Sequence, residues 1–181
     1  DSVYFYAGTG QAKQFFAASA GGATQLTSLP SGVGCPSAQD VFPLIAAGST
    51  VFFTVNIDQW GLVCTRQQVW RTDGTASGTQ LVKDFGADVY EMYADGDGFY
   101  AVAYDGSGTP ALGIWHSDGS AEVTSLVQGG FSTFSSSITG LGVFDGSFYF
   151  LVHQSDVEGY ALWRADATAA AKLADIPIRI Y

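Results

Sequence analysis

One short pattern is repeated four times along this chain of 181 residues. The clearest copy is WRTDGTASGTQLVK, residues 70–83, in which a strand runs into an Asp-Gly turn and a second strand returns. Weaker copies begin at Ile114 and Leu162, and a degraded copy begins at Phe15. Laid over one another, the copies give a repeat of about 48 residues, a length typical of propeller blades.

Each repeat also contains a short aromatic strand. These strands are VYFYA from Val3, VFFTV from Val51, FYAVAY from Phe99 and FYFLV from Phe148. Runs of β-branched and aromatic residues suit strands that are buried on both faces. Extended segments precede three of the four, so each full repeat contains four strands. The pattern predicts one all-β domain over residues 1–181, a four-bladed β-propeller of four-stranded antiparallel blades.

The two ends of the chain predict how such a propeller closes. The first repeat begins at its second strand, and the segment IPIRIY after the last repeat is one strand more than that repeat needs. We expect Ile178, Arg179, Ile180 and Tyr181 to pair with the N-terminal strand that contains Val3 and Phe5.

The same segment could instead pair with a neighbouring molecule. Strand addition of this kind would give a head-to-tail polymer rather than a closed monomer.

Composition restricts the possible partners. The formal net charge is −10, from 17 acidic and 7 basic residues, which disfavours binding to nucleic acid or to an anionic membrane surface. No apolar run reaches the roughly 18 residues that a membrane-spanning helix needs. The chain opens at Asp1 without a methionine, as expected of a mature secreted product or of a fragment. We therefore predict a secreted, extracellular or cell-surface location.

Two cysteines, Cys35 and Cys64, lie in the longest connections of the second repeat. Their spacing matches no compact metal motif, so we expect no zinc site. We predict a Cys35–Cys64 disulfide, which would stabilise the fold by about 3 kcal/mol in the chain-entropy model. Two separately buried thiols are the alternative.

The central repeat has a family resemblance. VWRTDGTASGTQLVKDF resembles the ELWxxDGTxxGTxLVKDI repeat of secreted and surface bacterial proteins, and LGVFDGSFYFLV resembles the segment that precedes it there. The resemblance covers essentially the whole chain as four repeats. It is specific in the second repeat, partial in the third and fourth, and poor in the first. It implies propeller-like blades in an extracellular protein and supplies no common catalytic residue.

Several aromatic residues are candidates for ligand contact. Trp70, Trp115 and Trp163 recur once per repeat, which favours packing between blades over a ring of sugar-stacking platforms. Trp60 lies outside the repeat pattern, next to a glycine, and is the candidate ligand contact.

Polar candidates have simpler explanations. The turn aspartates Asp73, Asp118 and Asp166 are expected to cap their own turns rather than bind metal. The sequence Asp95-Gly96-Asp97-Gly98 predicts a hairpin turn rather than a calcium loop. His116 is expected at a solvent-facing strand position, and His153 ends an aromatic strand; neither is placed to activate a nucleophile. We expect no cofactor and no metal.

These observations favour a non-enzymatic extracellular module with a structural or adhesive role. Its partner would be a second copy of the chain, through strand addition, or another cell-surface component. The alternative is a glycan-binding propeller that uses Trp60 and loop aromatics. A glycoside hydrolase is a further alternative, because 17 acidic residues are available but nothing in the sequence selects two of them.

Overall fold

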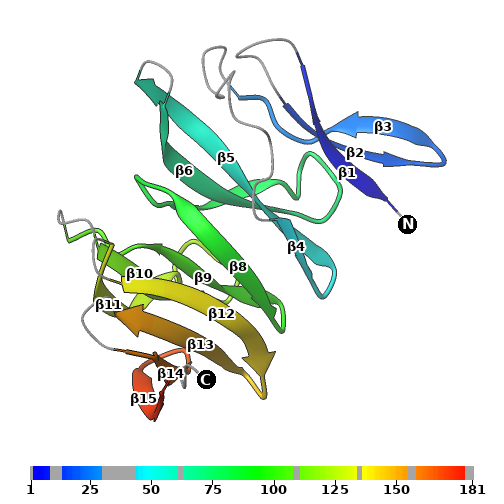
Figure 1. Cartoon of the computed structure of the whole chain (residues 1–181). Coiled ribbons are helices and arrows are strands. Elements are labelled where there is room, and N and C mark those ends of the chain that lie inside the picture. The colour runs from blue at the N-terminus through cyan, green and yellow to red at the C-terminus, as the bar shows by residue number, and fades with distance from the viewer. Residues whose placement is uncertain are drawn as a thin grey trace, which may run out of the picture. The chain divides into compact units, whose positions relative to one another are not determined.

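The computed structural model describes residues 2–8, 14–29, 44–60, 63–107, 111–133, 136–154 and 158–177 (Figure 1). The described residues form 15 β-strands in four separate antiparallel sheets and contain no helix. Accordingly, no helix able to cross a membrane is found in this part of the chain. The all-β prediction is confirmed.

The first sheet has three strands in chain order. They are β1 (Val3–Ala7), β2 (Gln14–Ser19) and β3 (Gly22–Gln25). In the described part of the chain, the first sheet begins at the aromatic strand β1. Among the described residues, β1 is hydrogen-bonded to β2 alone, so its other edge has no strand partner.

The second and third sheets each have four strands, and each strand pairs with the next one along the chain. The strands of the second sheet are β4 (Leu44–Ala47), β5 (Thr50–Trp60), β6 (Val63–Thr72) and β7 (Gln80–Asp84). Those of the third are β8 (Val89–Asp95), β9 (Gly98–Tyr104), β10 (Ala111–Ser117) and β11 (Ser125–Ser132).

The fourth sheet repeats this order. Its strands are β12 (Ser136–Phe144), β13 (Ser147–Gln154), β14 (Tyr160–Ala165) and β15 (Ala170–Ile176). The sheet therefore has a leading strand, an aromatic strand, and the two strands on either side of the repeated turn, as the sequence pattern predicted.

The strand register is the same in all four sheets. The residue at the tryptophan position of the repeat always faces the same position of the aromatic strand. The four cross-strand pairs are Phe5 with Phe16, Phe53 with Trp70, Ala101 with Trp115, and Phe150 with Trp163. Because a slip of one residue would turn every side chain to the other face, this shared register fixes which side chains reach the core.

Short turns join the leading strand of each four-stranded sheet to its aromatic strand. In the second and third sheets these two-residue turns begin with Gly48 and Gly96, at φ of 58° and 56°. In the fourth sheet the turn is Asp145-Gly146, with both residues at positive φ, as a type I′ hairpin turn requires. The hairpin expected at Asp95–Gly98 is confirmed.

The Asp-Gly pair of the repeat itself does not form a tight two-residue hairpin turn, which corrects the sequence-based expectation. In the second sheet Asp73 opens a longer loop, residues 73–79, and in the third sheet Asp118 opens residues 118–124. In both loops the aspartate carboxylate accepts hydrogen bonds from the residue two positions on, so the turn depends on more residues than the Asp-Gly pair.

The chain divides into two compact units, residues 1–88 and 89–181. Each unit contains two sheets and a hydrophobic core. In the first unit, β2 packs on β5, and the rings of Phe15 and Phe53 stack with centroids 3.9 Å apart. Ala17, Leu26 and Val55 complete this core. Burial of a Phe side chain contributes about 1.5–3 kcal/mol, so this contact is a large part of what holds the two sheets together.

In the second unit, the third and fourth sheets share one core. Its buried members are Tyr100, Val102, Leu112, Ile114, Phe131, Phe148, Phe150, Val152 and Ala165. The Tyr100 hydroxyl donates to the backbone oxygen of Gly146 over 3.0 Å, and burial is the main reason that the pKa of Tyr100 is raised to about 12. This bond ties the aromatic strand of one sheet to the hairpin of the next.

A second polar tie joins the leading strands β8 and β12, which lie side by side (Figure 1). The Tyr93 hydroxyl donates to the Gly140 oxygen over 3.1 Å, and the Glu91 carboxylate accepts from the Gly140 amide over 3.0 Å. The same carboxylate oxygen accepts from the Tyr93 hydroxyl. Burial, followed by the Glu91 contact, raises the pKa of Tyr93 to about 12.

Two predicted contacts involve residues outside the described part of the structure. These residues are Cys35 and the closing residues Ile178, Arg179, Ile180 and Tyr181. The disulfide and the closing strand therefore stay predictions. Assembly of the four sheets into one closed domain also stays a prediction.

The tie between β8 and β12 predicts that Gly140 tolerates no side chain. A Cβ at Gly140 would lie 2.4 Å from the Tyr93 ring, so Gly140→Ala must displace the ring and break the tie. We expect a loss of about 2 kcal/mol in the free energy of unfolding. The matched control is Gly21→Ala, where the nearest atom would be 3.7 Å away. Denaturant unfolding measures both; equal stability of the two variants would contradict the assignment.

Candidate functional site

The three repeat tryptophans differ in how they satisfy their indole N–H groups. Trp70 donates to the Gln68 side-chain oxygen and Trp115 to the Tyr104 backbone oxygen, each over 3.0 Å. The indole N–H of Trp163 is buried and has no hydrogen-bond partner. An unsatisfied buried donor costs about 1–3 kcal/mol, so this position calls for an explanation.

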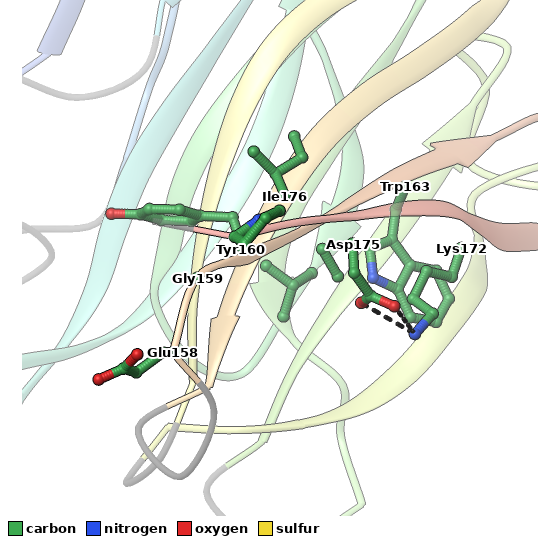
Figure 2. Close-up of a pocket in the computed structure, with 10 residues that line it drawn as sticks. Glu158, Gly159, Tyr160, Trp163, Lys172, Asp175 and Ile176 are labelled. Carbon is green, nitrogen blue, oxygen red and sulfur yellow. Dashed lines mark hydrogen bonds and ion pairs between the residues drawn. The ribbon is translucent and has the colours of Figure 1, made fainter. Parts of the chain in front are cut away.

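Trp163 also lines an open groove of about 660 Å³ on the fourth sheet (Figure 2). Val152, Ala161 and Trp163 lie on one face of the sheet and form the part of the lining that we call the floor, and the charged residues of the lining form what we call the rim. The lining residues are Val152, Glu158, Gly159, Tyr160, Ala161, Trp163, Lys172, Asp175, Ile176 and Pro177. An apolar floor with a few convergent polar groups is the usual composition of a small-molecule site.

Aromatic neighbours hold the Trp163 ring in place. The ring stacks on Phe150, with centroids 6.1 Å apart and an interplanar angle of 19°. It also meets Phe131 edge-on, at 5.5 Å and 88°. Contacts of both kinds contribute beyond the area they bury. The indole is therefore a rigid part of the groove, anchored in the core of the second unit.

A β-bulge in β15 places two charged residues of the rim, Lys172 and Asp175, together. Leu162 faces Ala174 and Trp163 faces Lys172, which leaves Leu173 as an extra residue. Without it, side chains three apart in a strand would point to opposite faces. With it, the Lys172 ammonium contacts both Asp175 oxygens at 3.0 Å, on the same side as Trp163 (Figure 2).

The Lys172–Asp175 ion pair is open to solvent. The two side chains are 48% and 74% exposed. An exposed pair of this kind contributes between 0 and about 1 kcal/mol, because water screens the charges and two long side chains lose rotational freedom. The pair therefore opens at little cost.

The other end of the groove is shaped by backbone. Gly159 has φ of 111°, and a Cβ there would lie 2.4 Å from the Ile176 oxygen. The ring of Tyr160 is directed away from Trp163 (Figure 2) and contacts the His153 ring, with centroids 5.2 Å apart. Tyr160 therefore contributes to the wall of the groove rather than to an aromatic platform.

The turn aspartates have the structural role that the sequence predicted. Asp73 accepts hydrogen bonds from the Thr75 amide and hydroxyl, at 2.9 and 2.7 Å. The Gly78 amide then donates to that hydroxyl, and a Cβ at Gly78 would lie 2.1 Å from an Asp73 oxygen. Both glycines of the DGTxxGT pattern thus belong to one hydrogen-bonded loop.

The same carboxylate chemistry recurs in the third and fourth sheets. Asp118 accepts from the Ser120 amide over 2.8 Å, and Asp166 accepts from the Thr168 amide and hydroxyl over 2.9 and 2.7 Å. In all three turns, side-chain hydrogen bonding from the residue two positions on is the main reason that the aspartate pKa lies below its ordinary value. Such groups are poor general acids.

One histidine prediction is wrong. His116, expected at a solvent-facing position, has a side chain that is 13% exposed, and its Nε2 lies 3.2 Å from Asp95 Oδ2. The Tyr100 ring covers it, with centroids 4.7 Å apart. The cause is the packing of the neighbouring aromatic strand, which strand alternation in a single repeat does not reveal.

None of the other candidate residues is among the described residues that line the groove. The backbone of Trp60 ends β5, opposite Val63, and its side chain lies outside the described part of the structure. Val3 and Phe5 lie on β1, at 69% and 37% exposure. No group of three or more metal-ligating side chains occurs among the residues described.

The sequence pattern did not reveal Glu158, Lys172 and Asp175. The one feature of the sequence that could have drawn attention to them is the departure of the fourth repeat from the DGTxxGT pattern. This repeat has Asp166-Ala167 and a shorter loop before β15.

Comparisons with known proteins give structural matches but no match to a sequence family. No family model and no curated protein sequence matches the chain. A crystal structure of an exo-β-1,3-galactanase from Phanerochaete chrysosporium, with β-1,3-galactotriose, matches 97% of the chain at 14% identity and a TM-score of 0.45. The chain spans about half of that protein, 49% of its length.

This match corrects the expected function. The matched protein is named as a galactanase with a bound oligosaccharide, which contradicts the expectation of a non-enzymatic structural or adhesive module that assembles by strand addition. That expectation is withdrawn. The match itself assigns no activity to this chain.

The turn carboxylates predict a specific acid sensitivity. Because folding lowers the pKa of Asp73, Asp118 and Asp166, their contribution is present above the ordinary value of 3.8 and is lost as pH falls through the folded values. Asparagine keeps the acceptor oxygen but does not titrate. We expect the triple variant D73N/D118N/D166N to show a flatter fall of the thermal midpoint between pH 5 and pH 2. A slope equal to that of the wild type would contradict this.

Proposed function

We propose that this chain binds carbohydrate in the groove on the fourth sheet. The observation that supports the proposal is the buried, unpartnered N–H of Trp163, a residue that lines that groove. The fold leaves this donor unsatisfied, so a ligand oxygen that reaches it would replace no existing hydrogen bond. The two sister tryptophans, whose N–H groups are already bonded, provide no such donor.

The groove offers both apolar and polar surface, as binding of a sugar ring requires. A hexose ring has C–H faces that pack on apolar surface and hydroxyl groups around its edge. Val152, Ala161 and Trp163 offer the apolar floor, while Lys172 and Asp175 offer a donor and an acceptor at the rim. Hydrogen bonds to charged groups are the stronger ones, so a small number suffices to orient a ligand.

The proposed activity is binding rather than glycoside hydrolysis. Hydrolysis needs two carboxyl groups across the scissile bond, one of them with a raised pKa. The groove lining contains two carboxyl groups, Glu158 and Asp175, which lie at opposite ends of the groove (Figure 2), and Lys172 holds Asp175 in an ion pair. Among the described carboxyl groups, burial raises the pKa of Asp88, which is not part of the groove lining.

An extracellular location fits this proposal. The lysine-poor composition, the resemblance to repeats of secreted bacterial proteins and the expected Cys35–Cys64 disulfide are its support. The partner would then be a glycan outside the cell.

We further propose that the four sheets are blades of one four-bladed propeller. Phe5 and Phe16 stack at 5.6 Å on a face of the first sheet where Phe5 is 37% exposed, whereas the equivalent Phe53 and Phe150 are fully buried. On the fourth sheet, Leu151 is half-buried on the face opposite the shared core. In a closed propeller these two faces would cover each other, and the closing residues 178–181 would pair with the free edge of β1.

A double-mutant cycle tests closure. If the two faces touch, Phe5→Ala and Leu151→Ala will be non-additive in the free energy of unfolding by at least about 0.5 kcal/mol. The control cycle pairs Phe5→Ala with Val123→Ala, an exposed residue of a turn. Additivity within about 0.3 kcal/mol in both cycles would contradict closure in this form.

A blocking variant tests carbohydrate binding. Ala161→Arg fills the floor of the groove, and we expect it to lower oligosaccharide affinity at least tenfold. The matched control, Ala171→Arg, puts the same side chain on an exposed position of β15 outside the groove. Calorimetric titration with a panel of neutral and acidic oligosaccharides measures both. Absence of binding to the whole panel, or equal loss in both variants, would contradict the proposal.

A further inference from the structure

The Lys172–Asp175 pair lies beside Trp163 in the groove (Figure 2). Lys172 is the direct cross-strand partner of Trp163, and Asp175 is the partner of Ala161, next to it on the groove floor. Both charged side chains lie at the Trp163 end of the groove, whereas Glu158 lies at the other end (Figure 2). The exposed pair therefore lies next to a side chain whose indole N–H is buried.

The charge of the groove limits what can enter. Its lining contains two carboxylates, Glu158 and Asp175, and one ammonium group, Lys172. The whole chain adds a formal net charge of −10. A uronate or sulfated sugar would meet repulsion from Glu158 at one end of the groove and from the net negative charge of the chain, while a neutral sugar would meet none.

We propose, resting on the carbohydrate-binding function above, that the groove selects neutral oligosaccharides and that Trp163 is its specificity-determining donor. Entry of the sugar separates Lys172 from Asp175. The Trp163 N–H then donates to a ring or hydroxyl oxygen, Asp175 accepts from one hydroxyl, and Lys172 donates to another. No covalent step is involved.

The separation of the ion pair is easy for a physical reason. An exposed pair gains little from its Coulomb attraction, because water screens both charges. The ligand replaces that weak contact with charge-assisted hydrogen bonds to each partner and supplies the acceptor that the indole lacks in the free protein. A ligand that lacks a suitably placed oxygen would open the pair without this compensation.

The indole N–H itself is the probe for the test. In the full chain labelled with ¹⁵N at tryptophan, the four indole resonances are recorded during titration with cellotetraose, laminaritetraose and galactotetraose, and with tetragalacturonate as the acidic counterpart. Trp163→Phe identifies the Trp163 resonance. We expect that resonance alone among Trp70, Trp115 and Trp163 to shift downfield with a neutral oligosaccharide, and tetragalacturonate to bind at least tenfold more weakly.

Two sets of variants complete the test. Trp163→Phe keeps the ring packed and removes the donor, so we expect a five- to tenfold loss of affinity for the neutral oligosaccharide. The matched Trp115→Phe should have no effect on affinity. Glu158→Gln with Asp175→Asn should raise the affinity for tetragalacturonate. The thermal midpoint of each variant shows whether it is folded. The change in chemical shift of the Trp163 indole is measured in the wild-type protein, so that result does not depend on the folding of a variant.

The outcomes separate the two proposals. If no oligosaccharide binds, or Ala161→Arg has no effect on binding, the carbohydrate site itself is wrong. If binding is blocked by Ala161→Arg but the Trp163 resonance stays in place, the role of the indole donor is wrong. If tetragalacturonate binds as tightly as galactotetraose, selection of neutral sugars is wrong.

Discussion

Packing of aromatic side chains between neighbouring sheets is the contact on which this structure depends. Phe15 and Phe53 join the two sheets of the first unit, and Phe148 and Phe150 lie in the core shared by the two sheets of the second. Each aromatic strand is apolar on both faces, so a sheet by itself would expose a face to water. The repeat is therefore stable only when it is stacked on a copy of itself.

Polar contacts between sheets refine this packing. The hydroxyls of Tyr100 and Tyr93 each donate to a backbone oxygen of the next sheet, and Glu91 accepts from the Gly140 amide. These bonds satisfy groups that burial would otherwise leave unpaired, and they require an exact strand register. The aspartates of the repeated turns act more locally, since each accepts hydrogen bonds within its own loop and takes no part in the packing between sheets.

The groove arises where one repeat departs from the others. Trp163 keeps the place of Trp70 and Trp115 in the register, but the fourth repeat has a bulge at Leu173 and a shorter turn. The bulge brings Lys172 and Asp175 to the same side, and the local surroundings leave the Trp163 N–H without an acceptor. Trp163 therefore differs from Trp70 and Trp115 in its hydrogen bonding, although all three occupy the same position of the repeat.

The sequence alone determined the repeat and the order of strands within it, but not the longer loop that the repeated Asp-Gly pair opens, because strand alternation and turn preferences act over a few neighbouring residues. It placed Trp163 correctly in a packed position and assigned Asp73, Asp118 and Asp166 to their turns. Only the tertiary structure showed that His116 is covered by Tyr100, that an extra residue in β15 pairs Lys172 with Asp175, and that the indole of Trp163 lacks a partner. Each of these depends on which side chains of other strands come close, and no local pattern encodes that.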